Sequence, residues 1–212
     1  MKYTGRIIGL IIMLMTIIAI RIYAYIYLDY PLTALPIAGI FSLVFVYWVG
    51  KKYDQVKFYS ERDSLTGLYN RRVIDTIFPI LLAQTDRKNE SLGILILDCN
   101  NFKTINDTQG HIKGDLVLRE VAASLLNVTR KTDLVARWGG DEFLIIVPNT
   151  DEKKIKIVIS RIETKLHELS RKLQISISVA SGFSIYPQNA TNFNDLIVVA
   201  DKMMYSIKNK LR

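Results

Sequence analysis

The sequence predicts an α/β (α+β) domain in which helices wrap a central sheet, preceded by an N-terminal transmembrane hairpin of two helices. Three observations lead to this prediction. The first fifty residues hold a disproportionate share of the hydrophobic residues. In the rest of the chain, apolar runs typical of strands alternate with amphipathic helical patterns. The apolar runs on either side of residues 137–143 are separated by a short turn, which predicts an antiparallel β-hairpin.

Composition narrows the classes of function. The chain has 212 residues, enough for one ordinary domain with extra segments. Cys99 is the only cysteine, so no intrachain disulfide forms, which fits a reducing compartment. The net charge of +8 suits anionic lipids or phosphorylated small molecules. No basic run with interleaved aromatic residues is present, so nucleic acid is not expected as a partner.

Two apolar segments near the N-terminus predict membrane spans. The first, Ile7 to Leu28, has 22 residues, which is enough to cross about 30 Å of hydrocarbon. Arg21 within it would extend to the nearer membrane surface. The second, Leu32 to Val49, has about the minimum length, with Pro36 in its first turns.

Basic residues flank this pair on one side, which predicts a cell-membrane protein with both termini and the rest of the chain in the cytoplasm. They are Lys2, Arg6, Lys51, Lys52 and Lys57. One alternative is a cleaved signal peptide, although no small-x-small cleavage site follows the apolar run. Another is a buried hairpin, although nothing else in the chain looks large enough to cover it.

The expected division is a membrane anchor over residues 1–50, a connector helix over 51–62 and a soluble domain over 63–212. Val49 and Val56 are seven residues apart. This spacing leaves two interpretations open for the connector, a solvated linker helix and a dimer seam.

The soluble domain begins with a helix, "NRRVIDTIFPILLAQ", capped by Asn70 and expected to kink or end early at Pro79. A buried strand, "SLGILILD", ends at Asp98, and the amphipathic helix "GDLVLREVAASLLN" follows. The hairpin strands are "DLVARW" and "FLIIVP". After the helix "DEKKIKIVISRIETKLHEL", the segment "LQISISVASG" at 173–182 alternates from Leu173 to Val179, which predicts a half-buried strand. The helix "FNDLIVVADKMMYSIKNK" closes the domain.

The hairpin tip, "RWGGDEF", carries two adjacent carboxylates that repel each other unless a cation joins them. Asp98 ends an apolar strand, where an unpaired charge is unfavourable. If the hairpin is a neighbour of that strand, Asp98, Asp141 and Glu142 form a cluster suited to Mg²⁺ or Mn²⁺. Gly139 and Gly140 leave room for a phosphate chain near the backbone. The alternative is a polar turn with solvated acids.

These residues resemble the GGDEF-type diguanylate cyclases. "GGDEF" at 139–143 is the family's naming motif, and three further segments match: "DSLTGLYNRR" at 63–72, "LDCNNFKTINDTQGHIKGDLVL" at 97–118 and "ADKMMYSIKNK" at 200–210. The resemblance covers residues 63–212. It implies a fold similar to nucleotidyl cyclase and polymerase palm domains. It also implies conversion of two GTP into cyclic di-GMP and two pyrophosphates across a homodimer, with two Mg²⁺ or Mn²⁺ ions in each active site.

The resemblance implies roles for individual residues. Asp98, the Cys99 carbonyl, Asp141 and Glu142 would bind metal, and Asp141 would also help to deprotonate the 3′-hydroxyl. Lys103 would stabilise charge on the phosphates, so that Asp141, Glu142 and Lys103 are the expected catalytic residues. For the Cys99 side chain, a redox role and simple core packing both remain open. Asn100 stands where many relatives carry a second acid.

The resemblance also implies a set of substrate-binding residues. Asn106 and Asp115 would recognise guanine, since its N1 and N2 donors suit a carboxylate and an amide can meet its remaining edge. For His111, a position near the nucleotide and a structural role in the turn are equally plausible. The full set is Phe102, Asn106, His111, Asp115, Gly139, Gly140, Lys208 and Arg212, the last two holding the triphosphate.

Arg130 and Asp133 match the family's inhibitory product site, an RxxD pair, although this pair alone also fits a surface salt bridge. The resemblance therefore favours a membrane-anchored, product-inhibited cyclase. The alternative is a catalytically weak or inactive receptor for cyclic di-GMP or GTP.

Overall fold

The computed structural model describes residues 3–29, 31 and 37–210. The chain divides into two compact units, Met1–Glu61 and Arg62–Arg212. Each unit is described by itself below.

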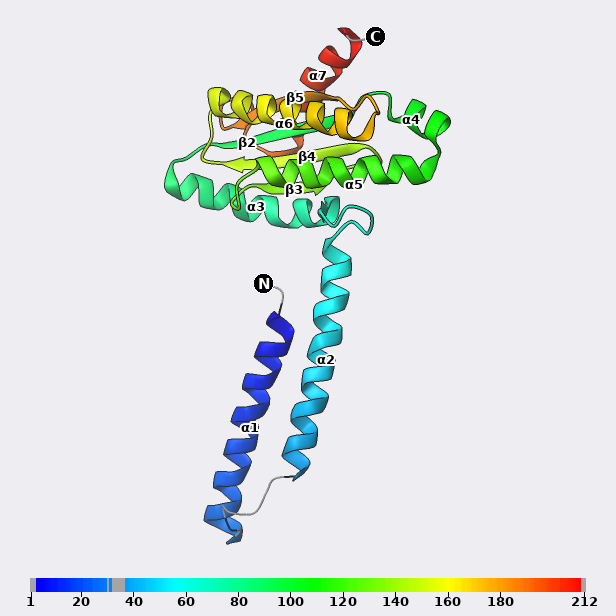
Figure 1. Cartoon of the computed structure of the whole chain (residues 1–212). Coiled ribbons are helices and arrows are strands. Elements are labelled where there is room, and N and C mark those ends of the chain that lie inside the picture. The colour runs from blue at the N-terminus through cyan, green and yellow to red at the C-terminus, as the bar shows by residue number, and fades with distance from the viewer. Residues whose placement is uncertain (1–2, 30, 32–36, 211–212) are drawn as a thin grey trace. The chain divides into compact units, whose positions relative to one another are not determined.

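The N-terminal unit is a pair of antiparallel helices, α1 (Thr4–Leu28) and α2 (Ile37–Glu61), shown in blue and cyan in Figure 1. Glycine allows the two helices to approach closely, since a Cβ on Gly5 would lie 2.7 Å from Cδ1 of Tyr53. Asp54 on α2 accepts hydrogen bonds from the backbone N–H of Gly5 and pairs with Nε of Arg6 at 3.0 Å. A carboxylate at the N-terminus of α1 satisfies free N–H groups there. This contact fixes how the two helices pair.

The predicted pair of membrane spans is supported only for the first helix. In the described part of the chain, α1 alone is long and apolar enough to cross a membrane, and a signal sequence would meet the same criterion. The prediction of a second span over 32–49 is not supported. Residues 32–36 lie outside the described residues, and α2 soon enters the charged sequence around Lys51, Lys52 and Asp54. The separately predicted connector is a continuous part of α2.

The second unit contains a mixed five-stranded sheet in the order β1-β3-β4-β2-β5. Only the β1–β3 pair is parallel; the other neighbours are antiparallel. The strands are β1 (Tyr69–Asn70), β2 (Leu92–Cys99), β3 (Leu134–Arg137), β4 (Glu142–Pro148) and β5 (Val179–Tyr186). The predicted hairpin is β3–β4, and β2 lies beside β4 in the centre of the sheet.

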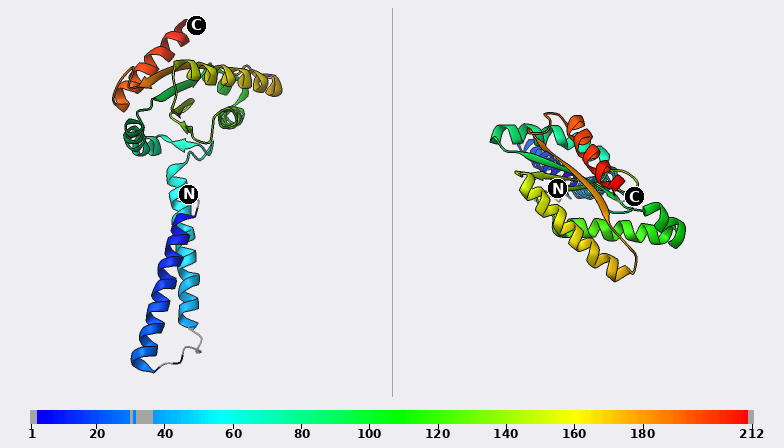
Figure 2. Two further views of the ribbon diagram at one scale, coloured as in Figure 1. Left: turned by 90° about the vertical axis from the view of Figure 1, so that its left-hand side faces the viewer. Right: turned by 90° about the horizontal axis from the view of Figure 1, so that it is seen from above.

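Helices cover both faces of this sheet, as the sequence predicts. Leu95 and Ile145 face a core formed with α5 (His111–Val128) and α6 (Glu152–Leu173). Ile94 and Ile146 face the opposite core, formed with α3 (Arg71–Lys88) and α7 (Phe193–Lys210). Figure 2 shows the two pairs of helices on opposite sides of the strands. Because both faces are buried, β2 is apolar from Leu92 to Leu97 rather than alternating, and Asp98 is its only charged residue.

Two predicted boundaries are wrong and one is confirmed. The Asn70 side chain caps α3 by accepting from the Val73 N–H. The helix nevertheless continues past Pro79 to Lys88, so the early end is wrong, while the alternative of a kink at Pro79 stays a prediction. The strand predicted over residues 173–182 is present, but its predicted start is wrong, since Leu173 ends α6 and β5 begins only at Val179. The intervening segment is held by the Ser170 hydroxyl, which accepts from the Ile177 N–H, so its apolar alternation reflects packing rather than strand pairing.

Candidate active site

The register of the sheet brings the three predicted acids to one end of β2. Asp98 is directly opposite Glu142 in the antiparallel β2–β4 pair. The backbone N–H of Cys99 donates to the carbonyl of Asp141 at 3.1 Å. These contacts fix the hairpin tip beside the end of β2 because they are backbone hydrogen bonds of the central sheet.

The two glycines of the tip have different surroundings. A Cβ on Gly139 would lie 2.5 Å from Oε2 of Glu142, so the missing side chain makes room for that carboxylate. A Cβ on Gly140 would meet nothing within 4 Å. The N–H groups of Trp138 and Gly139 both donate to the Glu142 carbonyl and close the turn. The tip is therefore tight around Glu142 and open at Gly140.

The acids at the tip are held in an unfavourable electrostatic environment. Burial raises the pKa of Asp141 and of Glu142, and the charge on Asp98 raises both further. Lys208 on α7 partly compensates, since its Nζ lies 2.6 Å from Oδ1 of Asp98, a side chain only 9% exposed. Arg137 also lowers the pKa of Asp141, but the two cations do not outweigh burial and the repulsion between the acids.

The chemistry of this cluster fits a divalent cation, although the side chains are not arranged around one. Carboxylate oxygens are the ligands that Mg²⁺ and Mn²⁺ prefer, and a cation would relieve the repulsion that raises the pKa values of Asp141 and Glu142. Within residues 3–29, 31 and 37–210, no group of three or more His, Cys, Asp or Glu side chains could hold an ion as it stands. The Asp98 carboxylate is instead directed to Lys208.

A polar cleft of about 410 Å³ adjoins the acids. It is lined by Cys99, Asn100, Asn101, Phe102, Lys103, Thr104, Asp141, Ser178 and Lys208. Lys103 and Lys208 bring two ammonium groups to it. The first turn of α4 (Phe102–Gln109) forms one wall, and the Asn101 side chain makes no capping hydrogen bond there. Free N–H groups at a helix start together with two lysines suit an anion such as a phosphate chain.

The predicted guanine-recognising residues lie on the adjoining pair of helices and do not line this cleft. Asn106 is half-buried on α4, where a Cβ on Gly114 of α5 would meet its side-chain oxygen. Asp115 follows Gly114 and is exposed, as is His111, the first residue of α5. Arg212 lies outside the described residues.

Sequence reasoning missed Asp63 and Arg137, which tie the hairpin to the start of the domain. Arg137 Nη1 lies 3.1 Å from Oδ1 and 3.2 Å from Oδ2 of Asp63, while its Nε and Nη2 donate to the Gly140 carbonyl at 3.1 and 2.6 Å. Asp63 also accepts from the N–H and hydroxyl of Thr66. The available signal was an arginine directly before the glycines and an aspartate at the start of the "DSLTG" segment.

Cys99 and Asn100 have structural surroundings within the site. Burial raises the pKa of the Cys99 thiol to about 12, with further contributions from Asp141 and Asp98. The protonated, buried thiol favours the core-packing interpretation over a redox role. The Asn100 side chain donates to the Ser178 hydroxyl at 2.9 Å, so it connects the end of β2 to the segment before β5.

The predicted product site forms a turn at the end of α5. Asp133 is buried and accepts from the backbone N–H of Arg130 at 2.8 Å. Among the described residues, neither Arg130 nor Arg161 has an ion-pair partner. This differs from the alternative interpretation of a surface salt bridge between Arg130 and Asp133.

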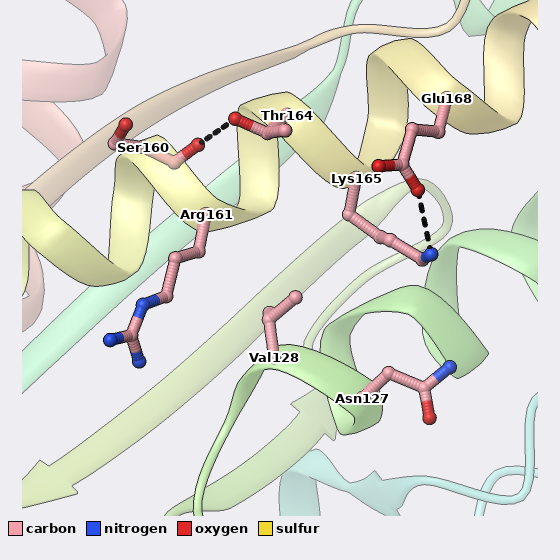
Figure 3. Close-up of a pocket in the computed structure, with 7 residues that line it drawn as sticks. All are labelled: Asn127, Val128, Ser160, Arg161, Thr164, Lys165 and Glu168. Carbon is pink, nitrogen blue, oxygen red and sulfur yellow. Dashed lines mark hydrogen bonds and ion pairs between the residues drawn. The ribbon is translucent and has the colours of Figure 1, made fainter.

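A second hollow of about 380 Å³ lies between the C-terminal end of α5 and α6, close in sequence to this turn (Figure 3). Asn127 and Val128 line it from α5, and Arg161 and Lys165 line it from α6. Lys165 is paired with Glu168 at 2.7 Å, whereas the Arg161 guanidinium extends into the space between the helices (Figure 3). Sequence reasoning missed Arg161, since nothing in its spacing links it to Arg130.

Comparison with known proteins identifies the second unit. The family model described as "Diguanylate cyclase, GGDEF domain" matches residues 60–212. Diguanylate cyclase DosC of Escherichia coli (strain K12) is 34% identical over 154 residues, which are 71% of this chain and 33% of DosC. The chain spans only 23–45% of the length of the first curated relatives that it matches.

Solved structures agree with this match. The isolated GGDEF domain of PA1120 (TpbB or YfiN) from Pseudomonas aeruginosa is 34% identical with a TM-score of 0.67, covering 71% of this chain and 90% of that one. The coiled coil and GGDEF domain of DgcB from Caulobacter crescentus, in complex with c-di-GMP, is 28% identical with a TM-score of 0.71 and covers 81% of this chain and 92% of that one.

Proposed function

Because the chain belongs to the GGDEF domain family, we propose that it is an active diguanylate cyclase that converts two GTP into cyclic di-GMP and two pyrophosphates. The observation that carries the proposal is the acid cluster. Asp98, Asp141 and Glu142 are all retained at one sheet end, beside a cleft lined by Lys103 and Lys208. A binding-only relative would have no need for acids whose pKa values are raised by burial and mutual repulsion.

In this proposal, Asp98, the Cys99 carbonyl, Asp141 and Glu142 hold Mg²⁺ or Mn²⁺, two ions per site. When bound, these ions stabilise negative charge on the reacting phosphate oxygens. Lys103 and Lys208 bind the triphosphate as ammonium groups. The first turn of α4 adds backbone N–H donors, and Phe102 and the open tip at Gly140 leave space for the nucleotide.

The reaction needs a base at the attacking hydroxyl. The Asp141 carboxylate accepts the proton of the 3′-hydroxyl, and its raised pKa favours this role. The 3′ oxygen then bonds to the α-phosphorus of the second GTP, and the bond to the bridging oxygen breaks to release pyrophosphate. Repeating the step in the opposite direction closes the ring. Each subunit holds one GTP, so the active form is a homodimer.

We also propose that the chain is organised as a membrane anchor (1–50), a connector helix (51–62) and a cyclase domain (63–212). Anchoring through α1 is supported by its length, its apolar composition and the absence of buried residues along it. The cyclase domain would lie in the cytoplasm, where GTP is available.

The deciding experiment incubates the full-length chain, purified in detergent, with GTP and Mg²⁺ and separates the products by chromatography. The expected result is cyclic di-GMP and pyrophosphate in a ratio of one to two. The alternative, a cyclic di-GMP or GTP receptor, predicts saturable binding of labelled nucleotide with no dinucleotide product at protein concentrations that support dimers. That outcome would overturn the cyclase proposal.

We further propose that Arg130 and Asp133, assisted by Arg161, bind cyclic di-GMP and inhibit the enzyme. Guanidinium groups without ion-pair partners suit phosphate or guanine, and the hollow beside the turn gives room for a ligand. Arg130→Ala is expected to leave the initial rate within about twofold and to raise the final product level about tenfold, because the loss of one charge-assisted contact weakens inhibitor binding. Progress curves measure both quantities.

Lys131→Ala is the matched control for this prediction, since it removes a neighbouring cation outside the Arg130/Asp133 pair. Its progress curve should follow that of the wild type. Equal product accumulation by Arg130→Ala and the wild type would contradict the inhibitory site without affecting the cyclase proposal.

A further inference from the structure

Gly114 is crowded on the side that faces Asn106. Gly114 lies in the first turn of α5 and is buried. A Cβ at this position would lie 1.9 Å from Oδ1 and 3.0 Å from Cγ of Asn106. The next nearest atom is Cζ of Phe102 at 3.3 Å. The space that a side chain would occupy is therefore filled by the Asn106 amide group.

The backbone around Gly114 fixes this arrangement. Gly110 separates α4 from α5 and adopts a left-handed φ of 81° that favours glycine. Its N–H donates to the Asn106 carbonyl, and its carbonyl accepts from the N–H of Gly114. The last turn of α4 is thereby held against the first turn of α5. Phe102, one turn before Asn106 on α4, packs near the same side of Gly114.

This contact orients a polar group that is otherwise unrestrained. No hydrogen bond to the Asn106 amide is formed by any of the described residues. The position of the amide is therefore set by the surface of Gly114 and not by a protein partner. Asp115 follows Gly114 directly and is exposed, so the helical turn that contacts Asn106 also carries a carboxylate open to a ligand.

We infer that Gly114 is a positioning residue for base selection: its missing side chain lets the Asn106 amide lie against α5, beside Asp115, where both can hydrogen-bond the same purine. The inference rests on the proposed GTP function and adds a residue to it. Gly114 touches no substrate and acts through Asn106. An added methyl group displaces the amide. Gly114 does not line the phosphate-binding cleft, and of its two nearest neighbours only Phe102, which carries no phosphate-binding group, does so.

The test is a double-mutant cycle on the full-length chain in detergent with Mg²⁺. Calorimetry measures binding of 3′-deoxyguanosine triphosphate, which lacks the attacking 3′-hydroxyl, and of inorganic tripolyphosphate. Gly114→Ala and Asn106→Ala are each expected to weaken nucleotide binding about tenfold, near the upper range for one hydrogen bond. The double variant should bind no more weakly than either single variant. Binding of tripolyphosphate should be unchanged in all variants.

Thermal unfolding shows whether the Gly114→Ala variant folds. If it does not, the double variant still tests the inference, because removing the Asn106 amide also removes its clash with the added Cβ. Gly93→Ala is a matched control: its Cβ would lie 2.2 Å from Cδ1 of Ile155, remote from Asn106, so it should lower the unfolding midpoint without changing nucleotide affinity.

Three outcomes would overturn the inference: wild-type affinity in Gly114→Ala, losses that multiply in the double variant, or an equal loss for tripolyphosphate. Failure of the proposed function gives a different result, in which the wild-type chain forms no cyclic di-GMP from GTP, whatever the affinities of the variants for the nucleotide.

Discussion

The pKa of Asp63 and the pKa values of the two acids at the hairpin tip are shifted in opposite directions within the same domain. Burial works to raise the pKa of Asp63, but hydrogen bonds from Thr66 and Arg137 outweigh it and hold that pKa below its ordinary value. For Asp141 and Glu142, burial and the charge on Asp98 raise the pKa above the ordinary value. The protein therefore neutralises one acid with its own residues and leaves the charges of the others only partly compensated.

Under the proposed function, this difference separates residues that stabilise the fold from residues that serve chemistry. A satisfied carboxylate contributes stability, whereas an acid held near like charges reduces it. Arg137 connects the two groups, since its guanidinium contacts both Asp63 and the Gly140 carbonyl. The Arg137–Asp63 contact therefore holds in place a hairpin tip whose acids repel each other. Removing Asp63 should lower the stability of the fold, whereas removing a charge at the tip should raise it.

Glu142→Gln gives the largest expected effect. The amide keeps the shape of the side chain, which fits beside Gly139, but loses the charge needed for a metal ligand. We expect the rate of cyclic di-GMP formation to fall by about a thousandfold or more, as for loss of a principal electrostatic contact in a transition state. Product chromatography measures the rate, and circular dichroism checks the fold.

Glu152→Gln is the control for this variant, because Glu152 is an exposed residue of α6 paired with Lys156. It should retain the wild-type rate. A Glu142→Gln protein with more than a tenth of wild-type activity would contradict the role of Glu142 and the contrast drawn with Asp63.

Asp63→Ala should have the largest effect on stability. The change leaves Arg137, whose side chain is 17% exposed, without its acid partner and frees the Thr66 N–H and hydroxyl. We expect the free energy of unfolding to fall by about 2–3 kcal/mol, typical for hydrogen bonds to a charged group. Urea titration followed by fluorescence measures it. The exposed ion pair between Glu152 and Lys156 is the control, since Glu152→Ala should change the free energy of unfolding by about 0.5 kcal/mol or less.

Much of the fold and part of the site could be predicted from the sequence. Apolar runs and helical periodicity located β2, β4, α5 and α6 because burial of both sheet faces determines these patterns. Asp98, Asp141 and Glu142 could be grouped because one strand end and one hairpin turn carry them. Contacts across long separations carry no local signal, which is why Arg137–Asp63 was missed.

Errors in the prediction have a similar physical origin. The alternation at Ile175 and Ile177 has the period of a strand, but these residues pack beneath α6 and the chain pairs only from Val179. Pro79 removes one hydrogen bond from α3, but the apolar residues Ile74 and Phe78 hold the helix against the sheet. In both cases tertiary packing determined the structure over the local preference.

Asp141→Asn tests the opposite side of the comparison and should stabilise the metal-free protein. It removes a half-buried charge that Asp98 disfavours, and keeps the size of the side chain. Loss of such a functional charge typically adds about 1 kcal/mol, which raises the unfolding midpoint of a domain of this size by about 2–4 °C. Scanning fluorimetry in the presence of a chelator measures the shift. A lower midpoint would show that Asp141 is a structural acid like Asp63.

The smallest expected effect is a difference in how the stability contributed by Asp63 and that contributed by Asp141 and Glu142 depend on pH. Because the folded pKa values of Asp141 and Glu142 are raised, their contribution is present below the unfolded pKa, near 4, and is lost as the pH rises through the folded values. For Asp63 the folded pKa is lowered, so its contribution is present above the unfolded pKa and is lost as the pH falls through the folded value.

Urea titrations of the chelator-treated wild type, Asp63→Asn and Asp141→Asn between pH 3 and 7 measure the free energy of unfolding of each protein as a function of pH. The advantage of the wild type over Asp63→Asn should grow as the pH rises, and its disadvantage against Asp141→Asn should grow in the same direction. Parallel profiles for the two variants would mean that Arg137 and Lys208 compensate their acids equally, and the division between a satisfied and an unsatisfied group of carboxylates would not hold.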